Sequence, residues 1–241
     1  MLAAIIPNDR QIYRVIKPTH ERFLRIIATK LTMSTSSSNT VVVGVDVGGP
    51  KKGFHAVALR EGQFLEKFAT LDAGEVLAWC RKLNVSAIGI DAPCCWSRTG
   101  CARPCERALA AEGIHTFATP SQAVGVRHKF YRWMRNGAEL FCLLTTHHRL
   151  FDGRHSASIP VCFETFPHAV ARALAGKILS AKHKHSDRRK LLREAGISVD
   201  SLSNIDMVDS ALCAHTAHHL LAGTFKTYGD AQEGFIVVPK L

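Results

Sequence analysis

The sequence lacks a long hydrophobic run and is short of acidic residues. No apolar stretch in the 241 residues approaches the roughly 18 that suggest a membrane span. The first apolar run, at residues 2–6, is too short for the hydrophobic region of a secretory signal. We therefore expect a cytoplasmic protein with no membrane partner. Acidic residues number 20 against 31 Lys and Arg, and the resulting net charge of +11 favours polyanionic partners.

The cysteines do not form the paired knuckles typical of a structural zinc site. Those at positions 94, 95, 101 and 105 follow the spacing C-C-x5-C-x3-C, which fits such a site poorly. Cys80, Cys162 and Cys213 lie inside apolar segments, as buried free thiols do. This cysteine usage is typical of a reducing cytosol.

Residues 1–33 differ from the rest of the chain because they are basic and carry no strand pattern. They hold six basic side chains against two acidic ones. We expect them to be a basic N-terminal extension that is not part of the native product, with translation beginning at Met33. A targeting or nucleic-acid-binding arm is the alternative. Residues 34–241 are then expected to form a single domain.

From residue 41 the pattern is α/β. The run VVVGVDV at 41–47 is rich in β-branched residues and predicts a central strand covered on both faces. Further strands are predicted at 54–59, 64–69, 86–90 and 159–166, with a possible edge strand at 235–238. Helices are predicted at 72–82, 104–112, 123–150 with a break at Asn136-Gly137, 167–175, 186–195 and 205–222.

This order of elements predicts a mixed central sheet. Three consecutive strands suit an antiparallel meander, and the later strands, separated by helices, suit parallel crossovers. The expected fold class is therefore α/β and ribonuclease-H-like, with helices flanking the sheet.

Three apolar strands each close with an acidic residue followed by residues that turn the chain. These acids are Asp46, Asp91 and Glu164. A carboxylate at the edge of an apolar strand is costly unless it is paired or bound to a metal. Ligand sites in α/β sheets lie beyond the carboxyl ends of the strands. We therefore expect the three acids to converge on one cleft, which Cys94, just after Asp91, is also expected to line.

The last long helix adds two further acids near its start. Asp206 and Asp209 are three residues apart and share one helical face. Ala211 and Ala214 are small enough to let this helix lie close to the sheet. Carboxylates without basic neighbours in sequence suit hard cations such as Mg²⁺. Two such ions about 3.5–4 Å apart can activate water and stabilise the leaving oxygen in phosphodiester hydrolysis.

Five short motifs together resemble domain-of-unknown-function family 429, which is grouped with predicted ribonuclease-H-like nucleases. They are VGVD at 43–46, IDAP at 90–93, RPCER at 103–107, FETFP at 163–167 and DMVDSA at 206–211. The resemblance covers about residues 41–222. It implies a divalent-metal nuclease site, with Mg²⁺ or Mn²⁺, made of Asp46, Asp91, Glu164 and Asp209 and assisted by Asp206. Glu106 stands where the family pattern leads us to expect Asp, and it remains a candidate for the cleft.

Basic residues near these acids are candidates for binding nucleic acid. The stretch at 182–190 includes Lys182, Lys184, Arg188 and Arg189, and it lies between the Glu164 strand and the last helix. These side chains could bind phosphates beside the metal, or they could form a solvated helix face. Arg103 and Arg107 are further candidates for phosphate contacts.

The residues thus predict a metal-dependent nuclease acting on DNA or RNA. Two alternatives remain open. One is an ATP-binding phosphotransferase of the related actin and sugar-kinase plan, because the segment from Asp46 to Lys51 loosely resembles their phosphate loop. Those proteins need two such domains to enclose the nucleotide. The other is a nucleic-acid-binding module that has kept the fold and lost catalysis.

Overall fold

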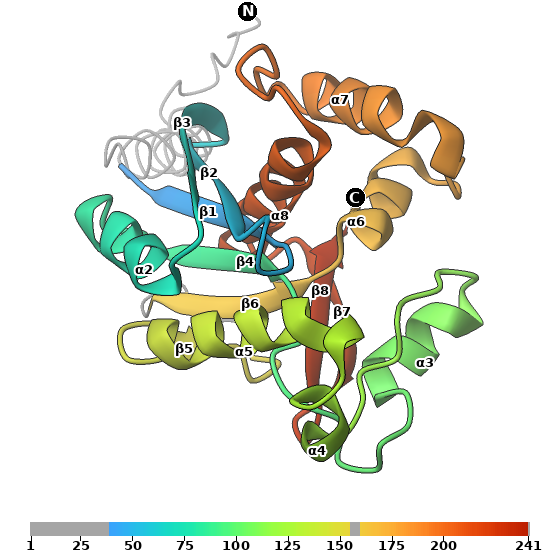
Figure 1. The fold of residues 1–241 in the computed structure, drawn as a ribbon. Coiled ribbons are helices and arrows are strands. Elements are labelled where there is room, and N and C mark those ends of the chain that lie inside the picture. The colour runs from blue at the N-terminus through green and yellow to red at the C-terminus, as the bar shows by residue number, and fades with distance from the viewer. Residues whose placement is uncertain (1–38, 155–159, 241) are drawn as a thin grey trace, which may run out of the picture. The chain divides into compact units, whose positions relative to one another are not determined.

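The computed structural model describes residues 39–154 and 160–240 (Figure 1). Residues 40–241 form one unit, and the description that follows concerns this unit. The basic extension predicted at 1–33, and its boundary with the domain, lie outside the described residues.

One mixed eight-stranded sheet runs through the unit, in the order β3-β2-β1-β4-β6-β8-β7, with β5 beside β6. The strands are β1 (Val41–Val47), β2 (Phe54–Arg60), β3 (Gln63–Thr70), β4 (Ala87–Asp91), β5 (Arg149–Leu150), β6 (Val161–Thr165), β7 (Phe225–Asp230) and β8 (Gly234–Pro239). β1, β2 and β3 form the predicted antiparallel meander, and β1, β4, β6 and β8 pair in parallel. This architecture is compatible with a ribonuclease-H-like fold.

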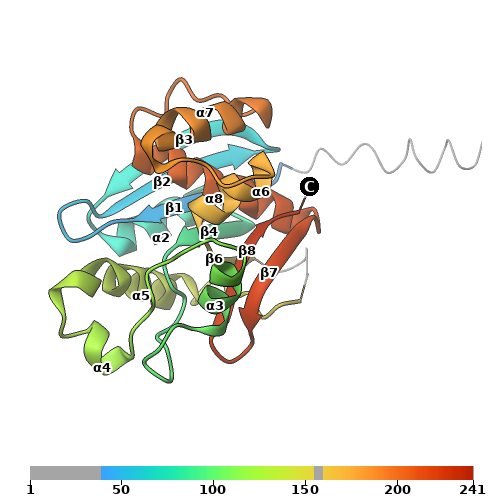
Figure 2. The same cartoon turned by 90° about the vertical axis from the view of Figure 1, so that its right-hand side faces the viewer.

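Helices cover both faces of the sheet. They are α2 (Ala73–Lys82), α3 (Pro104–Ala111), α4 (Gln122–Gly125), α5 (Arg132–Leu144), α6 (Pro167–Ala175), α7 (Lys184–Glu194) and α8 (Ile205–Leu221), with 3₁₀ turns η1 (Lys129–Tyr131) and η2 (Ala181–His183). Helix α8 packs on β1, β2 and β4, and α6 and α7 pack on α8. Helices α2 and α5 pack together on the opposite face, as Figures 1 and 2 show.

The alternation of strand side chains divides the core into two layers. On β1, Val42 belongs to the layer under α8, whereas Val41, Val43 and Val45 belong to the layer under α2 and α5. The continuous apolar run of β1 therefore reflects burial on both faces, as the sequence predicts.

Helix α8 lies against the sheet at two glycines. Gly44 of β1 and Gly89 of β4 are partners in the parallel ladder. A Cβ atom at Gly44 would lie 2.0 Å from the carbonyl oxygen of Ser210, and one at Gly89 would lie 2.6 Å from that of Cys213. The helix backbone thus occupies the space that side chains would need, and Ala211 and Ala214 are buried beside it as predicted.

The helix break predicted at Asn136-Gly137 is wrong, because α5 continues through both residues. Gly137 is required by packing, since its Cβ would lie 2.4 Å from that of Ala92. The Asn136 side chain donates a hydrogen bond of 2.8 Å to the carbonyl oxygen of Gly48. Both residues therefore dock the helix on the strand ends of β1 and β4.

Three other features differ from the prediction. The helix predicted to extend to residue 150 ends at Leu144, and Arg149–Leu150 form strand β5. Helix α7 begins at Lys184, two residues before the start predicted at residue 186. The segment predicted as an edge strand, β8, is an inner strand, because β7 pairs with it and forms the edge. The sequence FKTYGD of β7 is mostly polar and gave no apolar alternation to reveal it.

Most other boundaries agree with the sequence. Asp72 and Asn204 cap α2 and α8 with their side chains, and Gly176 ends α6 in a left-handed conformation. Cys80, Cys162 and Cys213 are buried free thiols. Within the described residues, every helix is too short or too polar to cross a bilayer.

The glycine contact yields a prediction about stability. Gly44→Ala should lower the free energy of unfolding by about 3 kcal/mol, because the new methyl group would force the backbones of β1 and α8 apart. Urea unfolding measures the loss. Gly49→Ala is the matched control, since a Cβ there meets nothing within 4 Å. Equal stability of the two variants would contradict the close approach of α8.

Candidate functional site

Four aspartates gather where α8 begins, over the ends of β1 and β4. Asp46 and Asp91 are partners in the parallel ladder, each two residues beyond a glycine that contacts α8. Because strand side chains alternate, both acids point toward the α8 face. Asp206 and Asp209 lie in the first turns of α8. We call Asp46, Asp91, Asp206 and Asp209 the aspartate cluster.

Burial and the charges of neighbouring aspartates raise the pKa of two of these carboxylates. Burial, followed by the charges of Asp209 and Asp206, raises the pKa of Asp46 from 3.8 to about 7. Burial, followed by the charges of Asp46 and Asp209, raises the pKa of Asp91 well above its ordinary value. The cluster therefore holds more negative charge than its protein environment alone stabilises.

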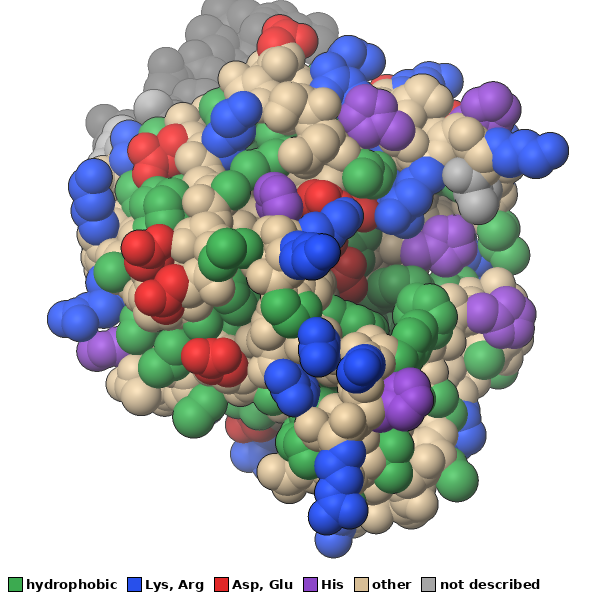
Figure 3. All heavy atoms as spheres, viewed as in Figure 1, with side chains coloured by type: hydrophobic (Ala, Val, Ile, Leu, Met, Phe, Trp, Pro, Cys, Tyr) green, Lys and Arg blue, Asp and Glu red, His purple; other side chains and the backbone are tan. Residues whose placement is uncertain are grey.

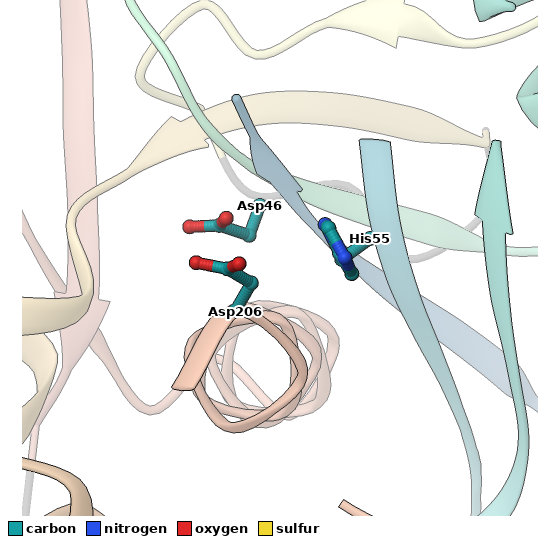
Figure 4. Close-up of side chains that lie close together, drawn as sticks. All are labelled: Asp46, His55 and Asp206. Carbon is teal, nitrogen blue, oxygen red and sulfur yellow. The ribbon is translucent and has the colours of Figure 1, made fainter. Parts of the chain in front are cut away.

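Within the cluster, Asp46 and Asp206 form a group with His55 that can hold a metal ion. One potential ligand atom from each residue lies within 4.8 Å of the other two. Figure 4 shows the two carboxylates side by side and pointing the same way, with the His55 ring beside them. The Nδ1 atom of His55 is buried and has no hydrogen-bond partner among the described residues. A buried nitrogen without a partner, in a residue grouped with two carboxylates, is a donor set suited to a divalent cation.

Three cations border the aspartate cluster. The Lys52 Nζ lies 3.0 Å from an Asp206 oxygen, and the Lys184 Nζ lies 3.0 Å from an Asp209 oxygen. Arg188 binds the other Asp209 oxygen and is buried. The lysine side chains remain 62% and 44% exposed. Figure 3 shows acidic side chains set back between Lys and Arg side chains at this place.

Hydrogen bonds of the backbone and of the Ser210 hydroxyl fix the loop that carries Lys52 and the start of α8. The loop from Gly48 to Gly53 is closed by a hydrogen bond of 2.7 Å from the Gly48 N–H to the Gly53 carbonyl, and it carries Lys52. Ser210 of α8 accepts a hydrogen bond from the Asp46 N–H and lies 2.7 Å from the His55 carbonyl oxygen. The start of α8 is thereby fixed to both β1 and β2.

Sequence reasoning missed His55, Lys52 and His168. His55 faces Asp46 across the β1–β2 ladder, so the hairpin register, which fixes that pairing, was the signal that could have revealed it. His168 of α6 lies near Arg188 and Lys184, and burial and these two charges lower its pKa. Its place beside the cluster depends on tertiary packing and leaves no local signal.

Glu164 is held in a different arrangement on β6. Its Oε1 lies 2.6 Å from Arg103 Nη2, and its Oε2 accepts from Arg103 Nη1 and from the Cys94 N–H, both at 2.9 Å. Glu164 is therefore compensated by a buried guanidinium. Its role as a metal ligand stays a prediction.

Arg103 and Glu106 belong to this buried ion-pair network. Arg103 is only 1% exposed and is paired with two carboxylates, and its predicted contact with phosphate stays a prediction. Glu106 accepts hydrogen bonds from the Arg103 N–H and Nε and from the Thr119 N–H. These contacts cap α3 and tie it to the loop before α4, which accounts for the carboxylate at this position.

The other basic residues predicted to contact phosphate differ in what their side chains bind. Lys184 and Arg188 point into the aspartate cluster from α7. Arg189 donates to the Leu202 carbonyl, and Arg107 donates to the Ala102 carbonyl. Lys182 is exposed.

A pocket of about 50 Å³ is lined both by a member of the aspartate cluster and by the Arg103–Glu164 pair. Asp91 and Glu164 both line it, together with Trp133, Phe117 and Phe166. This volume holds only a few water molecules. Asp91 is thus the member of the aspartate cluster that shares a pocket with the Arg103–Glu164 pair.

The ion-pair network predicts that Glu164 stabilises the fold. Glu164→Gln should lower the free energy of unfolding by about 3 kcal/mol, because it removes the charge that balances buried Arg103. In the control Glu112→Gln, which affects partly exposed pairs with Arg172 and Lys226, the loss should be at most about 1 kcal/mol. Unchanged stability together with lost metal binding would instead make Glu164 a metal ligand.

Comparison with known proteins finds one family. The family described as "Protein of unknown function (DUF429)" matches residues 44–233, a span that contains the aspartate cluster, His55 and the Arg103–Glu164 pair. The searches of curated proteins and of solved structures give no match. The match covers well over half of the sequence, and the chain belongs to this family of proteins of unknown function.

Proposed function

We propose that this protein is a divalent-metal-dependent nuclease that hydrolyses phosphodiester bonds of nucleic acid. The proposal depends chiefly on one observation, the gathering of four aspartates from β1, β4 and α8 at the carboxyl ends of parallel strands. Such carboxylates suit hard cations, and a cation there would lower the pKa of bound water and stabilise charge on a phosphodiester. The chain's net charge of +11 suits a polyanionic substrate.

The donor set favours Mn²⁺ over Mg²⁺. Asp46 and Asp206 offer oxygen atoms, which both ions accept. His55 offers an imidazole nitrogen, a ligand that suits transition metals better than Mg²⁺. We therefore expect Mn²⁺ to support activity at lower concentration than Mg²⁺.

The bordering lysines can bind the substrate phosphate. Each forms an ion pair with an aspartate and keeps much of its side chain in solvent. With a cation at the cluster, the Lys52 and Lys184 ammonium groups would lose part of their attraction to Asp206 and Asp209. Both lysines would then be free to turn toward phosphate oxygens of the substrate. Arg188 is buried and stays to orient Asp209.

The first test of this function is cleavage by an aspartate variant. Asp46→Asn should lower Mn²⁺-dependent cleavage of labelled DNA or RNA by at least about 100-fold, because it removes a charged ligand from the centre of the cluster. Gel analysis of single- and double-stranded oligonucleotides measures it. Asp200→Asn, which alters an exposed acid outside the cluster, is the control and should retain activity.

Three results would contradict the nuclease. They are cleavage that survives Asp46→Asn, cleavage that persists in EDTA, and an absence of cleavage on every substrate. Tight ATP binding in calorimetry would favour the phosphotransferase alternative.

A second test uses pH. Because folding raises the pKa of Asp46 from 3.8 to about 7, the folded protein binds more protons than the unfolded chain between these values. The metal-free protein should therefore lose stability as pH rises from about 4 to 7. A cation replaces the proton, so Mn²⁺ should raise the Tm strongly at pH 8 and hardly at pH 5.

Differential scanning fluorimetry of wild type and Asp46→Asn measures this pH dependence. The variant should have the higher Tm at pH 8 without metal and should gain little from Mn²⁺. An equal Mn²⁺ shift at pH 5 and pH 8 would show that the cluster does not exchange a proton for the cation.

A further inference from the structure

Aromatic rings and cations are exposed together between α3 and α5. Phe117 and Phe130 are 65% and 49% exposed, although most large apolar side chains of the unit are buried. Their ring centroids lie 5.3 Å apart, and Phe130 is 5.1 Å from Tyr131. This arrangement holds the rings in fixed positions at the surface without burying them. We call Phe117, Phe130, Tyr131, Arg127, Lys129 and Arg132 the aromatic-basic surface.

The cations of this surface have no acidic partners. Arg127, Lys129 and Arg132 are exposed, and none forms an ion pair with a described residue. The segment 113–138 contains no Asp or Glu. Figure 3 shows Lys and Arg side chains gathered with hydrophobic ones below the recessed acidic group. The charge complement of this surface is therefore a polyanion.

The aromatic-basic surface is continuous with the aspartate cluster. Phe117 lines the same pocket as Asp91 and Trp133. Helix α5, which follows Tyr131, is fixed to the strand ends by Asn136 and by the contact of Gly137 with Ala92. A ligand bound to the rings would thus extend toward Asp91 along one face of the molecule.

We propose that the aromatic-basic surface binds single-stranded nucleic acid and guides it to the aspartate cluster. The proposal rests on the nuclease function and names its substrate class. Exposed rings offer stacking faces to unpaired bases, whereas the bases of a duplex already stack on one another. Arg127, Lys129 and Arg132 would follow the phosphates between stacked bases. Phe117 lines the pocket, so a base stacked on its ring would lie at the pocket rim.

The charge excess favours nucleic acid over a protein partner. Aromatic and Arg side chains also occur in protein interfaces, but such surfaces usually mix charges of both signs. Here Arg127, Lys129 and Arg132 have no acidic partner among the described residues. Their surface adjoins the aspartate cluster, which is suited to phosphodiester chemistry. These two observations point to the same polyanionic ligand.

The test measures binding separately from cleavage. Fluorescence anisotropy with a labelled 12-nucleotide oligo(dT), an oligo(U) of the same length and a 12-base-pair duplex is recorded in EDTA, where no cleavage occurs. Wild type should bind both single strands at least about tenfold more tightly than the duplex. Phe117→Ala/Phe130→Ala should weaken single-strand binding by about tenfold or more, because two stacking platforms are lost.

Control variants separate stacking and charge from a general loss of fold. Ile178→Ala, which truncates an exposed apolar residue outside the surface, should leave the Kd unchanged. Arg127→Gln and Arg132→Gln should each reduce the slope of log K against log salt by about 0.7. Arg81→Gln, on α2, should leave the slope unchanged. Circular dichroism shows that each variant is folded.

The outcomes distinguish this proposal from the nuclease itself. Lost binding in the Phe variant with intact binding in Asp46→Asn supports the surface, even if no variant cleaves. Equal binding of duplex and single strand, unchanged binding in the Phe variant, or no binding to any oligonucleotide overturns it. If the Phe variant keeps both its cleavage activity and its affinity, the nuclease function is supported and the proposal for the aromatic-basic surface is refuted.

Discussion

The close approach of α8 to the sheet is the constraint on which the site depends. At Gly44 and Gly89 the helix backbone lies where side chains would otherwise stand. The next residues on the same strand faces are Asp46 and Asp91, and the first turns of the helix carry Asp206 and Asp209. A larger residue at either glycine would move the helix outward and separate the strand acids from the helix acids. The glycines therefore set the spacing of the carboxylates, although they take no part in binding.

The close approach of α8 brings four carboxylates together, and the neighbouring cations neutralise only part of their charge. Four carboxylates face three cations, Lys52, Lys184 and Arg188. The remaining negative charge appears as the raised proton affinity of Asp46 and Asp91. A proton fills this deficit at low pH and a cation can fill it at neutral pH. Under the proposed function, this deficit would contribute binding free energy for the metal.

The sequence predicted most of the sheet but not β5 or β7, and it predicted the start of α8 and all four members of the aspartate cluster, because each of these depends on a local pattern. Asn204 caps a helix, VVVGVDV forms a buried strand, and acids at strand ends meet at one edge. The pairing of Glu164 with Arg103 could not be read locally, since 61 positions separate the two. His55 depended on hairpin register, and the continuity of α5 depended on what Gly137 packs against. Local sequence patterns fail where the role of a residue depends on a contact with a residue far away in the sequence.

Acids on adjacent strands of one sheet edge have opposite roles in this protein. Glu164 is compensated by a guanidinium and gains stability from it, so removing its charge harms the fold. Burial and the charges of Asp209 and Asp206 raise the pKa of Asp46, so removing its charge should relieve the fold and, under the proposed function, remove a metal ligand. Asp91, between them on β4, shares a pocket with Glu164 and repels Asp46. Partner charge, more than position at the strand end, therefore decides whether an acid at this edge of the sheet is compensated.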